Sequence, residues 1–291
     1  MPYGITWKRF AKDLRSEVQE DNVSNGAAAL AYYLMLSIFP AMIALISLLP
    51  FLPIPNLENA ILDILNEALP GQAAQMFTQT INEVVSEKRE GLLSLGLLLA
   101  IWAASNGMFA IMQQLNITYD VVEGRPFWKT RGTALLLTLF FGVLVIGAFS
   151  LVVAGGYLQS FLSNSWDWGT PLLVGFAIIR WTIITAALLL AFAVTYYYGP
   201  DVEQKFRFIT PGSILGVALL IAASLAFKFY VDNFGKYNAT YGSLGAMIAL
   251  MLWLNITGLV ILLGSEINAL IEHYSSEGKD KGEKREPAQA A

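Results

Sequence analysis

Six stretches of the chain contain no Asp, Glu, Lys or Arg, and each is long enough to cross a lipid bilayer as one helix. They are residues 22–57, 91–119, 132–166, 181–200, 208–227 and 237–265. None shows the two-residue alternation of a membrane β-strand, so the pattern predicts helices. Only 14% of the residues are charged, against about 25% in a soluble domain. This composition argues against a soluble enzyme, a nucleic-acid-binding protein and a disordered chain.

The basic residues are distributed unevenly between the connections of these helices. Thirteen of the eighteen lie in the N-terminal segment, the second and fourth connections and the C-terminal tail: Lys8, Arg9, Lys12, Arg15, Arg125, Lys129, Arg131, Lys205, Arg207, Lys279, Lys281, Lys284 and Arg285. The opposite side has Lys88, Arg89, Lys228 and Lys236, and Arg180 lies inside a span. Because Lys and Arg accumulate in cytoplasmic loops, both termini are predicted to be cytoplasmic.

The sequence therefore predicts an all-α, polytopic membrane protein with one six-helix transmembrane domain over residues 1–272. The expected spans are about 26–52, 91–118, 132–162, 172–198, 211–231 and 243–270. A polar segment, 273–291, is expected to form a disordered cytoplasmic tail.

Two amphipathic segments lie outside the spans. Residues 5–20 place Trp7, Phe10 and Leu14 on one helical face. This pattern predicts either a helix lying in the membrane interface or one packed on the bundle. Residues 56–90 contain two helical patterns separated by Pro70 and Gly71, which predict an extracytoplasmic helical hairpin.

Arg180 is the most unusual polar residue inside a predicted span. It lies about nine residues from the outer end, or roughly 13 Å deep at 1.5 Å per residue. A guanidinium there is costly and should face the bundle interior or a water cavity. It could anchor an anionic lipid headgroup, since guanidinium pairs bidentately with phosphate. It could equally be a structural link to carbonyl groups.

Other residues within the spans have two interpretations each. Glu266 could couple transport to protons or be a structural, hydrogen-bonded carboxyl. Asn106 and Asn255 could line a polar path or join helices by hydrogen bonds. Pro40 removes one helical hydrogen bond, so it could be a hinge or a static kink.

The fifth span begins with Gly212 and Gly216 in a GxxxG arrangement. This spacing predicts close packing of helix backbones.

The catalytic inventory is thin. The chain has no cysteine and a single histidine, His273, so neither thiolate chemistry nor a zinc site is expected. There is no Walker loop, GxSxG or HExxH motif. We therefore predict no enzymatic activity, no metal and no cofactor.

Several sequence blocks occur in the order found in one family. They are AAALAYY at 27–33, LSIFP at 36–40, YYYGP at 196–200, PGS at 211–213, YGSLG at 241–245 with Trp253 downstream, and GSEINA at 264–269. Over about residues 5–272 the chain resembles the YihY/BrkB family of bacterial inner-membrane proteins. Tyr33, in the first block, joins Arg180, Asn106 and Asn255 as a candidate substrate-binding residue.

The resemblance implies a six-span protein of the cytoplasmic membrane without an agreed activity. Members have been connected with serum resistance and with export of lipid or lipopolysaccharide. An older family label, tRNA-processing ribonuclease BN, finds no support in this chain, which has a pI near 5.1 and neither a basic groove nor an aqueous carboxylate cluster.

Two functions from different classes follow. The first is a transporter or flippase-like protein for a lipid or another amphiphilic anion in envelope biogenesis, with membrane lipids as partners. The second is a non-catalytic envelope assembly or structural factor with protein partners, for which the hairpin 56–90 would be a docking surface. A lipid-accessible cavity beside Arg180 would favour the first.

Overall fold

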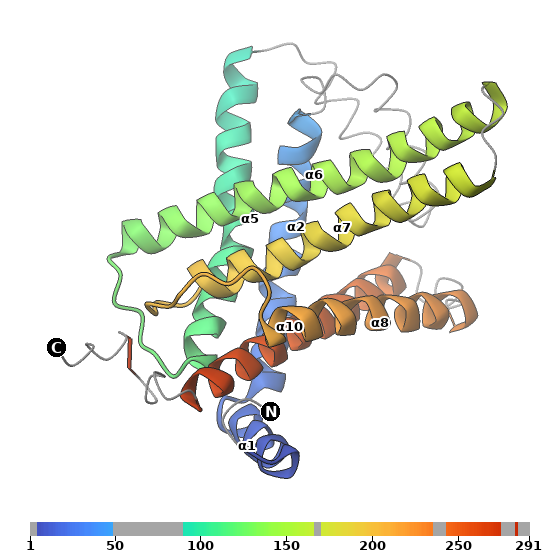
Figure 1. Ribbon diagram of the computed structural model, residues 1–291. Helices are drawn as coiled ribbons and strands as arrows, with labels where there is room; N and C mark the ends of the chain where they lie inside the picture. The colour runs from blue at the N-terminus through green and yellow to red at the C-terminus, as the bar shows by residue number, and fades with distance from the viewer. Residues whose placement is uncertain (1–4, 49–89, 166–169, 235–242, 275–282, 285–291) are drawn as a thin grey trace.

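The computed structural model describes residues 5–48, 90–165, 170–234, 243–274 and 283–284, and within them every regular element is a helix (Figure 1). The helices are α1 (Trp7–Glu20), α2 (Val23–Leu48), α5 (Glu90–Thr118), α6 (Phe127–Ser165), α7 (Thr170–Tyr198), α8 (Pro211–Phe234) and α10 (Ser243–His273). The prediction of an all-α polytopic protein is confirmed. The predicted hairpin lies outside the described residues, apart from its last residue.

Five of these helices are long and apolar enough to cross a membrane, within the part of the chain that the structure describes. They are α5, α6, α7, α8 and α10, and α2 adds a shorter described apolar stretch over Val23–Ile38. Each of these six helices has the larger part of its residues in one of the six charge-free stretches of the sequence.

The tightest packing joins α2, α5 and α10. Helix α2 lies against both α5 and α10, α8 packs on α10, and the α6–α7 pair is attached through α5 and α8 (Figure 1). Leu30, Met112 and Leu262 are fully buried where these helices meet. Gly258 of α10 allows close approach, because a Cβ there would lie 3.1 Å from the carbonyl oxygen of Ala27 in α2. Small residues at such contacts are typical of membrane helices.

Exposed apolar side chains gather on the outer helices. Helices α6, α7 and α8 have many exposed large apolar residues, among them Leu136, Val143, Ile178, Ile179, Leu225 and Phe229. An apolar surface of this kind is suited to contact with lipid acyl chains, because in the membrane these side chains are not exposed to water.

At the first turn of α8, the backbones of α8 and α10 are in direct contact. A Cβ at Gly212 would overlap the carbonyl oxygen of Gly264, and the backbone N–H of Gly212 donates to Asn268 Oδ1 over 2.9 Å. Gly216, one turn further, faces the ring of Phe192 in α7. The packing role predicted for this glycine pair is confirmed.

Helix α1 packs on the end of α10. Thr6 caps it by accepting from the backbone N–H of Arg9. The ring of Phe10 lies 6.4 Å from that of Tyr274, whose hydroxyl donates to Asp13. Burial and this hydrogen bond raise the pKa of Tyr274 to about 12. The structure shows that this segment packs on the end of the bundle, while Trp7 remains 71% exposed. Its position in the membrane interface stays a prediction.

Helix α2 continues without a break through Pro40. One turn earlier, the Ser37 hydroxyl donates to the carbonyl oxygen of Tyr33 over 2.8 Å. The hinge role of Pro40 stays a prediction.

Candidate functional site

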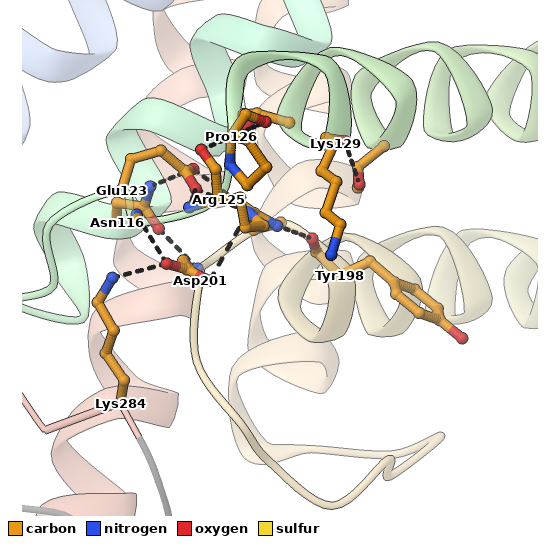
Figure 2. Close-up of polar contacts among 12 residues, drawn as sticks. Asn116, Glu123, Arg125, Pro126, Lys129, Tyr198, Asp201 and Lys284 are labelled. Atoms are coloured by element: carbon orange, nitrogen blue, oxygen red, sulfur yellow. Dashed lines mark hydrogen bonds and ion pairs between the residues drawn. The ribbon is translucent and has the colours of Figure 1, made fainter.

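The α5–α6 loop, the α7–α8 loop and the C-terminal segment meet at one end of the bundle (Figure 2). Helix α5 ends just before Asp120, whose left-handed φ of 55° is incompatible with a continuing α-helix. The backbone N–H of Glu203 donates to the carbonyl oxygen of Lys284 over 2.8 Å. Three segments far apart in the sequence therefore share one polar surface.

Arg125 and Glu123 form the centre of this surface. The Arg125 guanidinium donates to both carboxylate oxygens of Glu123, at 2.8 and 2.7 Å, and to the carbonyl oxygens of Tyr198 and Gly199, at 3.2 and 2.9 Å. It thereby satisfies carbonyl groups at the end of α7 that have no helical donor. Burial opposes ionisation of Glu123, but hydrogen bonds from Arg125 and Asn116 outweigh it and lower the pKa to about 2.

Asp201 ties the other segments to this pair. Its carboxylate accepts from the backbone N–H of Gly124 over 2.8 Å and from Lys284 Nζ over 2.6 Å, while its own N–H donates to Asn116 Oδ1 over 2.7 Å. Arg125 Nε lies 3.7 Å from its second oxygen. Because these groups already bind one another, the arrangement fits a clamp between loops rather than a ligand site.

Arg131, one turn into α6, is a buried cation that the sequence reasoning placed in a loop. It is 6% exposed. Its Nη2 donates to Asn106 Oδ1 and to the Trp102 carbonyl oxygen, at 2.7 and 3.1 Å, and it stacks 4.3 Å over the Trp102 ring. No carboxylate among the described residues pairs with it. The cation–π contact and two carbonyl-type acceptors take the place of an acid.

Arg180 projects from α7 toward α6. A Cβ at Gly155 would lie 2.6 Å from Arg180 Cδ, so that glycine makes room for the side chain. The guanidinium lies 5.9 Å from the Trp181 ring, and its Nε is buried without a hydrogen-bond partner.

An apolar groove of about 780 Å³ runs along α7, and Arg180 is not among its lining residues. The described residues that line it recur every three or four positions: Leu173, Val174, Ala177, Ile178, Trp181, Thr182, Thr185, Ala186 and Leu189. Over these positions the helix rises roughly 24 Å at 1.5 Å per residue, most of the thickness of a hydrocarbon core of about 30 Å. Trp181 lines the groove, and its ring lies 5.9 Å from the Arg180 guanidinium.

Glu266 lies at the junction of α10, the end of α5 and the α1–α2 turn. It is 1% exposed, and its Oε1 has no hydrogen-bond partner. Next to it, the hydroxyls of Ser265 and Thr118 are 2.5 Å apart, and the Asp21 carboxyl lies within hydrogen-bonding reach.

The residues singled out in the sequence do not form one site. Within the described part of the chain, no hydrogen bond or ion pair joins any two of Arg180, Asn106, Asn255, Tyr33 and Glu266. Asn106 accepts a hydrogen bond from Arg131. Tyr33 is 44% exposed and its ring packs against that of Tyr32. No group of three His, Asp or Glu residues in the described segments could hold a metal ion.

These features define a multi-pass membrane protein with an end-face clamp, one buried arginine, one half-buried arginine and a buried glutamate. The chain belongs to the Virulence factor BrkB family, whose model matches residues 14–289.

Relatives of similar length support this assignment. A Bacillus subtilis (strain 168) protein named as ribonuclease-like, YfkH, is 35% identical over 90% of this chain and 94% of its own. UPF0761 membrane proteins of Aggregatibacter aphrophilus and Aeromonas salmonicida are 23% and 24% identical, over 94% and 91% of this chain and 95% and 89% of theirs. The names of the UPF0761 relatives carry no enzymatic activity. No solved structure matches the chain.

Proposed function

We propose that the protein moves an anionic lipid or a similar amphiphile between the leaflets of the bacterial cytoplasmic membrane. The observation that carries this proposal is the apolar groove on α7, whose lining residue Trp181 has its ring 5.9 Å from the Arg180 guanidinium. The groove is long enough for much of an acyl chain. The guanidinium supplies a cation for one phosphate, with an Nε that has no other partner.

The position of Arg180 inside an apolar span would make its interaction with a lipid phosphate favourable. A guanidinium inside an apolar helix bundle is expensive unless an anion or polar groups compensate for it. A lipid phosphate drawn beside it would meet charge-assisted hydrogen bonds in a low-dielectric setting, where such bonds are strong. The apolar wall formed by α7 would meanwhile keep the acyl chain out of water.

Lipid scrambling in reconstituted vesicles tests the function. Wild-type protein is expected to expose fluorescent phosphatidylglycerol of the inner leaflet to dithionite added outside. R180A should slow exposure about tenfold or more, because charge-assisted hydrogen bonds contribute about 1.5–3 kcal/mol. R180K keeps the charge but loses the bidentate geometry, so it should give an intermediate rate.

A matched pair of tryptophan variants tests the groove separately. A186W fills the groove and should slow scrambling. I183W adds the same bulk at a half-exposed α7 position outside the groove and should not. Equal rates in wild type, R180A and A186W, or no scrambling by any of them, would remove the proposal.

The same proposal places the end face that carries Arg125, Asp201 and Lys284 in the cytoplasm. The bias of Lys and Arg toward the segments that form this end supports that orientation.

A further inference from the structure

The carboxyl of Glu266 is buried in a place where a second acid is its neighbour. Only 1% of the residue is exposed, and Oε1 has no hydrogen-bond partner. The Asp21 carboxyl, at the end of α1, lies within hydrogen-bonding reach. Two ionised carboxylates so close repel each other, and the fully buried one, Glu266, is costly to desolvate.

Acids face Glu266 from the other elements packed around it as well. Glu17 on α1 and Asp120 at the end of α5 both act on it electrostatically. Tyr119, which directly follows α5, also interacts electrostatically with Glu266. None of these groups supplies the positive charge that an ionised Glu266 would need.

From this geometry we infer that Glu266 and Asp21 form a proton-binding site, in which one proton is shared between the two carboxyls. The protonated group donates to the other, as in other paired carboxyls. The shared proton joins the α1–α2 turn to α10. When it leaves, repulsion between the two carboxylates separates α1 from the end of α10. The site is independent of the lipid function proposed above.

The position of Asp21 explains why α1 would be the part that moves. Asp21 is the C-cap of α1, and Asn22, which follows it, has a left-handed φ of 50°. No residue of α1 is buried, so its contact with α10 depends on a few side chains such as Phe10 and Tyr274. Few buried contacts mean a low free energy of local opening.

Distance measurements between spin labels test this site in the full-length protein. The chain has no cysteine, so A11C on α1 and V122C in the α5–α6 loop, both exposed, give a clean label pair. Between pH 6 and pH 9 the distance should lengthen in the wild-type background. E266Q should hold the low-pH distance throughout, because a glutamine at 266 donates to Asp21 as the protonated acid does.

D21N provides a second variant in case E266Q does not fold, and it should also abolish the change by removing the repulsion. E20Q alters an exposed acid on the same helix and should behave as the wild type. The inference is overturned if the wild-type distance does not change with pH, or if E266Q or D21N keeps the change. Reversal of the high-pH distance by sodium but not by choline would also overturn it, since the site would then bind a metal cation.

Discussion

Glu123 and Arg125 are two residues apart in one short loop, and their interaction connects this loop to the end of α7. Arg125 also donates to the end of α7, and Asn116 links Glu123 to Asp201. A charge-assisted, bidentate pair that is partly shielded from water is stronger than an ordinary surface ion pair. The pair is therefore expected to contribute measurably to the stability of this end of the molecule.

Replacing Glu123 with glutamine should lower the free energy of unfolding by about 1 kcal/mol at pH 7. The folded pKa of Glu123, about 2, is below its usual value of 4.5. Its ionisation therefore stabilises the fold above about pH 4.5, and this contribution is lost as the pH falls toward 2.

Thermal unfolding of wild type and E123Q across this range measures the effect. The difference in midpoint should be constant above about pH 5 and should narrow at lower pH. E20Q, on the exposed face of α1, is the control and should show a much smaller difference. A wild type–E123Q difference that widens with acid would contradict the assignment.

Arg131 and Arg180 show how much of a residue's surroundings could be predicted from the sequence. Arg180 stands alone in an apolar stretch, so its position between helices could be expected. Arg131 follows Arg125 and Lys129 closely, and a charge count assigns it to the loop. Its burial depends on Asn106 and the Trp102 ring, which lie on another helix and are invisible to a count along the chain.

Among the elements, the crossing of α8 and α10 is the closest contact that the sequence anticipated. Two backbones meet at Gly212 and Gly264 with no side chain between them. Tyr196 of α7 joins the same place, donating to the carbonyl oxygen of Ile261 over 2.9 Å. Three helices are thus fixed by backbone contacts and hydrogen bonds, which dominate where lipid weakens the hydrophobic drive.

G212A should destabilise the protein by about 2 kcal/mol or more, because the added methyl group overlaps backbone that cannot move aside. G147A is the matched control. A Cβ at Gly147 on α6 meets nothing within 4 Å, so alanine there should be neutral or stabilise by up to about 1 kcal/mol. Unfolding in detergent, followed by tryptophan fluorescence, measures both. Equal stability of G212A and wild type would contradict the close crossing.

Helix ends were less predictable than helix existence. The charge-free stretch 132–166 suggested a helix starting near residue 132, but α6 begins at Phe127. The difference arises because Lys129 and Arg131 belong to the first turns of the helix, where the guanidinium is buried against α5. A prediction that excludes charged residues from membrane helices does not take into account that a neighbouring helix can supply hydrogen-bond acceptors for the charge.

At the scale of the whole molecule, the sequence predicted the six apolar helices that the described residues contain, but not which helices are neighbours. Each of these helices is apolar around its whole circumference, so no stripe identifies the side that faces the protein. The central position of α2, α5 and α10 follows from small residues such as Gly258 and Ala27, which are frequent throughout the chain. The Glu266–Asp21 contact depends on how α1 folds back, and no local pattern encodes it.

The meeting of the α5–α6 and α7–α8 loops at one end requires that both lie on the same side of the membrane. In the cysteine-free chain, V122C and I209C give exposed thiols in these two loops, and P171C gives one at the opposite end of α7. A membrane-impermeant maleimide should label V122C and I209C only in inverted vesicles, and P171C only in right-side-out vesicles. Wild type should remain unlabelled in both.

Labelling of V122C and I209C on opposite sides would contradict the fold itself. Labelling of both from outside would leave the fold intact and reverse the proposed cytoplasmic orientation, and with it the leaflet from which Arg180 is reached.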